Sequence, residues 1–249
     1  MTVTAATIFC NIQLLPLMTT IKKGQVDVLA VNLIMFLCIP FFQTGVGDHH
    51  AFGTRTIDLG YYDNIFYHSS HGRPLGCTLI KGGNHVSAHF DPILVLLSPL
   101  YLLAQRAETI LIIQSVWTAL GVIPAYLIGS RILNSRPAGL VMAIAYAAHP
   151  ALHGANLYEF HSLTLLAMPL LWALYFLQIG ALRRYYFSLF VLLLVREDVA
   201  LLTCFVGLSA ILDNRRGMVR AGWITILVSL VYFGLVKSFI MTSGELLNS

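Results

Sequence analysis

Two acidic residues that could do chemistry lie in the stretch IDLGYYDN, where Asp58 and Asp63 are five positions apart. A carboxylate held next to a substrate hydroxyl can act as a general base. Tyr61 and Tyr62 are typical of aromatic side chains at the level of lipid headgroups, so we expect a short amphipathic helix lying in the membrane interface. The two acids are either catalytic or serve only to keep a solvated loop polar.

The stretch NHVSAHFDP places His85 and His89 four positions apart. This spacing puts both imidazoles on one face of a helix and is used for metal ligation. Asp91 could complete a site for a divalent ion such as Mg, Mn or Zn. A glycine pair before the stretch and Pro92 after it argue against a regular helix, and the alternative is that both histidines only form hydrogen bonds at the interface.

The stretch HPALHGANLYEFH, residues 149–161, contains another pair of histidines at the same spacing. A proline and a glycine within it predict a structured turn rather than a continuing helix. If this segment faces Asp58, its side chains supply contacts to a substrate; otherwise it is a polar hairpin. The predicted substrate contacts here are His149, Asn156, Glu159 and His161.

The stretch VREDVAL places Arg196, Glu197 and Asp198 consecutively between two strongly apolar arms. Charged groups at membrane depth are costly unless they are paired or face water. Either Arg196 pairs internally with one of the two acids, or its guanidinium offers two parallel donors to a phosphate group. We expect all three side chains to contact a substrate.

These residues belong to a largely apolar chain. Hydrophobic residues make up 57% of it and charged residues 10%, against about 25% charged in a typical soluble domain, and the mean hydropathy is +0.78. Several apolar runs approach the length of about 20 residues that a membrane span needs. The sequence therefore predicts an all-α protein, a polytopic bundle of transmembrane helices forming one domain over residues 1–249. Membrane lipids are expected partners and nucleic acid is not.

Lysine and arginine residues cluster between the apolar runs, and such clusters stay on the cytoplasmic side of a membrane. Placing them inside leaves residues 43–91, 149–161 and 196–198 on the external face. The apolar segment 92–103 is about 18 Å long as a helix, too short to cross, and we expect it to re-enter from the external side. The other expected spans are residues 28–42, 109–128, 139–148, 163–179, 185–195, 199–212 and 221–240.

The predicted topology gathers ionisable side chains on one face. All of the histidines lie in residues 43–91 and 149–161, and most of the acids lie in the three external segments. The opposite face is basic. A bundle with a purely structural role has no reason for this asymmetry, so ligand binding or catalysis is expected at the external face.

The motifs IDLGYYDN, HGRPL, NHVSAHFDPILVLLSPLY, AHPALHGANLYEFH and VREDVAL, in this order, resemble a family of bacterial integral-membrane proteins known as domain of unknown function 2079. The resemblance covers about residues 50–240. That family looks like a branch of the GT-C superfamily of membrane glycosyltransferases, which use a polyprenyl-phosphate-linked sugar and an essential acid in the first external loop. The resemblance implies a GT-C-like fold in the bacterial inner membrane, with a periplasmic active face.

Carried over to this chain, the resemblance puts Asp58 at the position of the essential acid, with Asp63 beside it. Arg196 corresponds to a family lysine that suits a lipid phosphate. Arg73, in HGRPL, joins the predicted substrate contacts. The chain is expected to be shorter than full-length family members, and a partner chain could supply further C-terminal spans.

Three functions stay open. The first is a glycosyltransferase in which Asp58 deprotonates an acceptor hydroxyl and a cation, or Arg196 with His85 and His89, stabilises the departing phosphate. The second is a non-catalytic component that binds or transports a lipid or sugar phosphate. The third is a metal-binding membrane protein built on the histidines.

Overall fold

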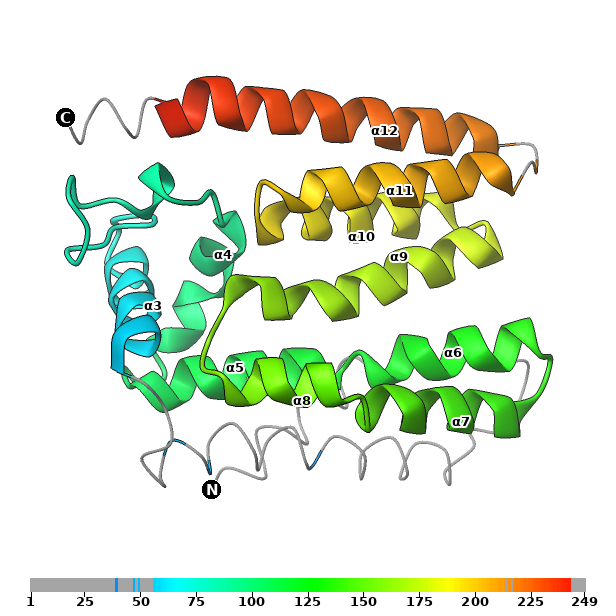
Figure 1. Ribbon diagram of the computed structural model, residues 1–249, viewed down its shortest axis with the longest axis horizontal. Coiled ribbons are helices and arrows are strands. Elements are labelled where there is room, and N and C mark those ends of the chain that lie inside the picture. The colour runs from blue at the N-terminus through cyan, green and yellow to red at the C-terminus, as the bar shows by residue number, and fades with distance from the viewer. Residues whose placement is uncertain are drawn as a thin grey trace.

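The computed structural model describes residues 56–213, 215 and 217–242, together with the single positions Ile39, Gly47 and His49 (Figure 1). Within these residues the regular structure is helical, apart from an isolated antiparallel bridge between Gly76 and Asn84. The predicted all-α class is confirmed for this part of the chain. The predicted first span, residues 28–42, lies outside it except for one position.

Most of the helices run side by side along the molecule, and the first described ones pack at one end (Figure 1). The helices are α3 (Thr56–Ser70), the 3-10 helix η1 (His85–Ser87), α4 (Pro92–Tyr101), α5 (Ala107–Ala119), α6 (Val122–Ile132), α7 (Arg136–Ala147), α8 (Pro150–Leu157), the 3-10 helix η2 (Ser162–Leu166), α9 (Ala167–Ile179), α10 (Leu182–Val195), α11 (Val199–Leu212), α12 (Met218–Leu235) and the π-helix η3 (Val236–Met241).

Three helical stretches in the described part of the chain are long and apolar enough to cross a membrane: Ala107–Ile132, Ser162–Ile179 and Met218–Met241. All three overlap spans expected from the sequence. Helix α4 has 10 residues, about 15 Å, and it lies beside α3 at one end of the bundle (Figure 1). It therefore does not cross the bundle, in agreement with the expectation for residues 92–103.

Residues 149–161 differ from the polar turn predicted for them. Pro150–Leu157 form helix α8, which follows α7 and lies alongside α5 (Figure 1). Proline at the first turn of a helix removes no hydrogen bond that the helix needs, so Pro150 begins a helix here instead of ending one. His149 and His153 consequently lie part-way along the bundle, and residues 158–161 reach its end.

The two ends of the bundle carry different chemistry. We call the end formed by α3 and residues 71–91, 158–161 and 196–198 the polar end. The turns at residues 133–135 and 180–181 and the described residues between α11 and α12 lie together at the opposite end (Figure 1). That end, the basic end, carries Arg131, Arg136, Arg183, Arg184, Arg215 and Arg220. The charge asymmetry expected from the sequence is therefore an asymmetry between the ends of the helices.

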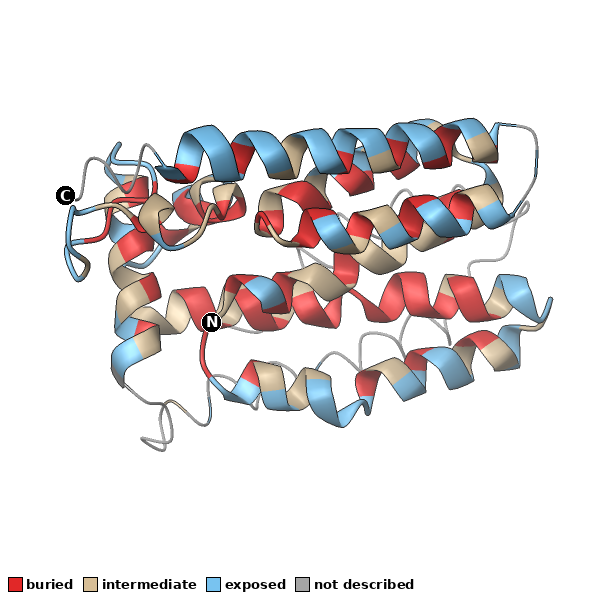
Figure 2. Cartoon of the chain, turned by 45° about the horizontal axis from the view of Figure 1, so that its top comes forward, coloured by how far each residue is buried: buried red, intermediate tan, exposed pale blue. Residues whose placement is uncertain are grey.

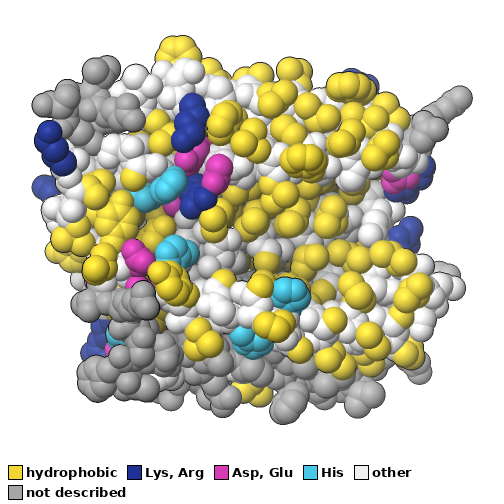
Figure 3. Space-filling view, in the orientation of Figure 1, with side chains coloured by type: hydrophobic (Ala, Val, Ile, Leu, Met, Phe, Trp, Pro, Cys, Tyr) yellow, Lys and Arg dark blue, Asp and Glu magenta, His cyan; other side chains and the backbone are white. Residues whose placement is uncertain are grey.

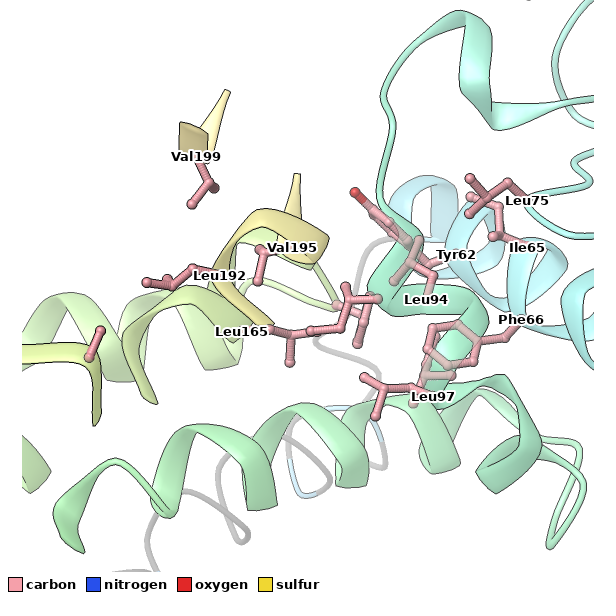
Figure 4. Close-up of a cluster of buried hydrophobic side chains, with 14 of the residues drawn as sticks. Tyr62, Ile65, Phe66, Leu75, Leu94, Leu97, Leu165, Leu192, Val195 and Val199 are labelled. Atoms are coloured by element: carbon pink, nitrogen blue, oxygen red, sulfur yellow. The ribbon is translucent and has the colours of Figure 1, made fainter. Parts of the chain in front are cut away.

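Helix α3 is packed into the core and does not lie free on the interface. Ile65 and Phe66 are fully buried, and they belong to one apolar cluster with Leu94 and Leu97 of α4 (Figure 4). The same cluster continues to Leu165, before α9. Burying each large apolar side chain stabilises the fold by about 1.5–3 kcal/mol relative to leaving it in water, so this contact anchors α3 and, with it, the residues of IDLGYYDN.

The outer surface of the bundle is apolar. Helix α12 turns a largely exposed face outward (Figure 2), and Trp223, Leu227, Leu230 and Phe239 on α12 and η3 are exposed. A continuous exposed apolar face of this kind suits contact with lipid chains rather than water.

Small and hydroxylic residues let α11 and α12 approach closely. A Cβ atom added to Gly222 would lie 2.5 Å from the carbonyl oxygen of Gly207. Further along the same contact, the hydroxyls of Thr203 and Ser229 are 2.6 Å apart and buried. Small residues and interhelical hydrogen bonds of this kind are what hold helices together where lipid surrounds them.

A pair of glycine substitutions on α12 tests this contact. Gly222→Ala forces α11 and α12 apart, so we expect a loss of about 1–3 kcal/mol of stability. Gly234→Ala is the matched control, because no atom lies within 4 Å of the added Cβ and a helical alanine is favoured over glycine by about 0.5–1 kcal/mol. Thermal unfolding of the detergent-solubilised variants measures both. Equal midpoints for the two variants would contradict the close contact.

Candidate functional site

The start of α3 is tied to the segment that follows α8. The backbone N–H of Leu59, in the first turn, donates to Oε2 of Glu159 at 2.8 Å, and the Glu159 side chain is buried. A carboxylate at a helix N-terminus satisfies a free N–H group and interacts favourably with the helix dipole. This contact joins two motifs that are 100 residues apart in the sequence.

The backbone at Glu159 is strained, and a buried glutamine holds it. Glu159 has φ = 105°, a value that residues other than glycine rarely adopt. Nε2 of Gln114, a fully buried residue of α5, donates to the Glu159 carbonyl at 2.9 Å. Its Oε1 accepts the N–H of His161 at 2.8 Å. Gln114 thereby sets where the Glu159 and His161 side chains point.

Asp58 and His161 meet at the polar end. Nε2 of His161 lies 3.9 Å from Oδ2 of Asp58, and the side chains are 35% and 45% exposed. An ion pair this open contributes little to stability. Both groups are instead accessible to a molecule that approaches the polar end, with the ring of Tyr62 at 5.7 Å from that of His161.

Asp63 faces a different neighbour from Asp58. Five residues along a helix correspond to a rotation of about 140°, so the two acids of IDLGYYDN do not share a face. The hydroxyl of Tyr101, at the end of α4, donates to Oδ1 of Asp63 at 2.8 Å. Burial raises the pKa of Asp63, against the opposing effect of that hydrogen bond.

A buried chain of three polar side chains lies beneath this surface. The hydroxyl of Tyr61 is 2.5 Å from Nδ1 of His85, and Nε2 of His85 is 3.5 Å from Oδ2 of Asp91. His85 and Asp91 are 1% and 0% exposed. Burial raises the pKa of Tyr61, so its phenol stays protonated and donates to Nδ1. Nδ1 is then the acceptor of this hydrogen bond, and Nε2, which is buried without a hydrogen-bond partner among the described residues, lies on the side of Asp91.

Glu197 connects three parts of the chain at the polar end. Its Oε1 lies 3.1 Å from Nδ1 of His89 and accepts from Nζ of Lys237 at 3.1 Å, and its Oε2 accepts the N–H of Phe90 at 3.0 Å. Burial by itself would raise the pKa of this carboxyl, but the hydrogen bonds outweigh it and lower the pKa to about 2. The same contact raises the pKa of His89. Glu197 is therefore a carboxylate at neutral pH, and its contact with His89 favours the protonated form of the imidazole.

Arg196 is paired with Asp198. Its Nε donates to Oδ1 at 2.9 Å and its Nη2 donates to Oδ2, so the guanidinium and carboxylate form a two-pronged pair. The side chains are 19% and 42% exposed. The internal pair foreseen from the sequence thus forms. A phosphate would bind the other NH₂ group of Arg196 or displace Asp198.

The two histidines of NHVSAHFDP have ring centres 6.0 Å apart but contact different partners. His89 turns to Glu197, whereas His85 lies between Tyr61 and Asp91. Residues 56–213, 215 and 217–242 hold no group of three histidine, cysteine or acidic side chains placed to bind a metal ion. The metal site of His85, His89 and Asp91 stays a prediction.

Three of the predicted substrate contacts lie away from these groups. Asn156 is buried and accepts a hydrogen bond from the hydroxyl of Ser115 at 3.1 Å, between α8 and α5. His149 lines a separate cavity of about 440 Å³ among residues of α6, α7, α8 and α9. Arg73 is an exposed residue of the loop after α3.

Lys237 was not among the residues selected from the sequence, although a signal was present. It is the one charged residue in the apolar run 221–240, and an isolated charge in a span marks a functional position. It lies in the π-helix η3, a distortion that is frequent at functional sites. Figure 3 shows basic, acidic and histidine side chains side by side toward the polar end.

The comparison with known families agrees with this architecture. The family described as predicted membrane protein (DUF2079) matches residues 48–245. The chain belongs to the DUF2079 family. No curated protein and no solved structure matches it. The matched region includes every helix from α3 to η3, so the whole polar end lies within it.

The contact between His89 and Glu197 predicts a pH dependence of stability in this DUF2079 protein. The pKa of His89 is higher in the folded protein than in the unfolded chain. The stabilisation of the fold by protonated His89 is therefore fully present below the ordinary histidine pKa of about 6.5. It is lost as the pH rises through the pKa of the folded state. We therefore expect the advantage of wild type over His89→Gln, measured as a thermal unfolding midpoint in detergent, to shrink as the pH is raised above about 6.5.

The control for this measurement is His71→Gln, an exposed histidine of the same loop. Its difference from wild type should stay the same over that pH range. A His89→Gln difference that does not change with pH would mean that the ion pair does not form.

Proposed function

We propose that this DUF2079 protein is a GT-C-like glycosyltransferase that takes a sugar from a polyprenyl-phosphate donor at the polar end of the bundle. The observation that carries the proposal is the position of Asp58. It is a partly exposed acid at the start of α3, held 3.9 Å from His161 by a segment that comes 100 residues later. A carboxylate that is fixed in place and still reachable is what a general base requires.

The reaction that fits this site has one proton transfer and one displacement. Asp58 accepts the proton of an acceptor hydroxyl, whose oxygen forms a bond to the anomeric carbon of the sugar. The bond from that carbon to the phosphate oxygen breaks, and the electron pair leaves with the lipid phosphate. His161, beside Asp58, stabilises the carboxylate in its reactive orientation as a positioning residue.

Cations for the departing phosphate are available at the same end. Arg196, Lys237 and His89 all lie there, and each is bonded to Glu197 or Asp198. Such pairs keep the cations in place until a phosphate exchanges with a carboxylate partner. Asp198 is the exchangeable one, because it is 42% exposed whereas Glu197 is 2% exposed.

The polar end faces the periplasm in this proposal. The arginine-rich turns all lie at the basic end, and the positive-inside rule places such turns in the cytoplasm. The polar end of a protein in the bacterial inner membrane is then on the external side, where a lipid-linked sugar would be used.

A second candidate is a protein that binds or moves a phosphate-bearing lipid without cleaving it. The pairing of Arg196 with Asp198 supports a binding protein as well as a transferase. Exchange of Asp198 for a phosphate is a binding step, which both functions require. The two candidates differ in what they require of Asp58, which only the transferase uses to remove a proton.

The test is mass spectrometry of the lipids that co-purify with wild type and with Asp58→Asn. For a transferase we expect the sugar-bearing polyprenyl phosphate to be enriched at least about 10-fold over free polyprenyl phosphate in the variant, because loss of a general base slows transfer by about 100-fold or more. Asp213→Asn, at the basic end, is the matched control and should leave the wild-type ratio unchanged.

Asp63→Asn separates the two acids of IDLGYYDN. Because Asp63 faces Tyr101, we expect the ratio of sugar-bearing to free polyprenyl phosphate in Asp63→Asn to be much closer to the wild-type ratio than in Asp58→Asn. The same sugar-bearing lipid at the same ratio in wild type and Asp58→Asn would support the binding protein. Absence of any polyprenyl lipid from both would refute the proposed donor.

A further inference from the structure

An apolar groove runs along the bundle from Leu96 of α4 to the first turn of α10. It has a volume of about 570 Å³, within the range of sites that hold small ligands. Side chains of α5, α6, α9 and α10 form its walls, and one residue of α4 joins them. The principal lining residues are Trp117, Leu127, Met168, Trp172, Phe176 and Phe187.

Two arginines stand at one end of this groove. Arg183 and Arg184, in the first turn of α10, line it and are exposed. Cζ of Arg184 lies 5.9 Å from the centre of the Phe176 ring, over the wall of the groove. Arg131 of α6 adds to the positive charge, because it and Arg184 both act electrostatically on Tyr175, another lining residue.

No acid offsets this charge among the described residues that line the groove. Asp213, an acidic residue of the basic end that is not part of the groove lining, is paired with Arg215, which also donates to the carbonyl oxygens of Leu177 and Gln178 at the end of α9. The groove therefore combines aromatic and aliphatic walls with an uncompensated positive end. A ligand that matches it is apolar along its length and anionic at one end.

We propose that this groove binds an anionic phospholipid from the membrane leaflet at the basic end, with its phosphate on Arg183 and Arg184 and one acyl chain along Trp172 and Phe176. Basic pockets between transmembrane helices on the cytoplasmic side are suited to anionic headgroups. The site is separate from the polar end and does not depend on the function proposed there.

The position of the charge argues against a polyprenyl chain in the groove. A donor whose phosphate lies at the polar end would direct only its uncharged tail toward the arginines. An uncharged tail gains nothing from two guanidinium groups, whereas a phosphate at that end forms charge-assisted hydrogen bonds with both.

Tryptophan fluorescence tests the proposal directly. Two of the three tryptophans, Trp117 and Trp172, line the groove, and Trp223 is exposed on α12. The full chain carrying Trp223→Phe is reconstituted in vesicles of phosphatidylcholine containing a small fraction of a lipid with brominated acyl chains, which quenches nearby indoles. We expect brominated phosphatidylglycerol to quench at least about twofold more than brominated phosphatidylcholine at the same fraction.

The arginines are then changed in the same background. Arg183→Gln with Arg184→Gln should abolish the difference between the two lipids. Arg136→Gln with Arg220→Gln removes the same number of charges from the basic end outside the groove lining and should keep it. Thermal unfolding of both double variants shows whether each is folded, and Phe187→Ala provides a second disruption of the groove that leaves the arginines in place.

Three results would overturn the proposal. Equal quenching by the two brominated lipids would mean that the groove does not select an anionic headgroup. Selective quenching that survives loss of both groove arginines would place the selectivity elsewhere. A polyprenyl lipid that co-purifies and is lost on Phe187→Ala, but not on the arginine changes, would show that the groove belongs to the donor lipid.

Discussion

The polar end depends on one buried carboxylate. Glu197 lies between α10 and α11, 2% exposed, and it is stabilised by His89, the N–H of Phe90 and Lys237. A buried carboxylate without such partners would be strongly destabilising. Because its partners come from the first loop and from the last helix, satisfying this single charge draws both to the α10–α11 turn.

Several other features follow from that contact. Phe90, bonded through its N–H to Glu197, immediately precedes Asp91 and the start of α4. The position of α4 sets where Leu94 and Leu97 meet Phe66 of α3. The orientation of α3, and with it the direction of Asp58, is thus linked through packing to the contacts of Glu197.

A second constraint acts at the start of α3, where the segment around Glu159 contacts it. Glu159 adopts a backbone conformation that costs free energy, and two hydrogen bonds from the amide group of Gln114 hold the segment in place. This conformation places the Glu159 carboxylate on the first turn of α3 and the His161 ring next to Asp58. The strained backbone of Glu159 is held by a buried polar side chain in the middle of an apolar helix. Backbone strain of this kind is typical of functional sites, where the direction of a side chain matters more than stability.

The sequence by itself determined the class of the protein, the places of the three span-length helices in the described part of the chain, and the separation of basic turns from polar segments. These properties depend on local composition, because about 20 consecutive apolar residues span a bilayer whatever their neighbours are. It also selected Asp58, Arg196 and Glu197, each of which stands out against an apolar or aromatic background.

Only the tertiary structure decided which charged groups meet. Asp58 lies next to His161, whereas Asp63 of the same helix bonds to Tyr101. Glu197 bonds to Lys237. His149 lines a separate cavity. These contacts depend on how each helix is rotated and shifted against its neighbours. One residue of shift turns a helix by about 100°, so spacing along the chain could not foresee partners 40 or 100 residues away.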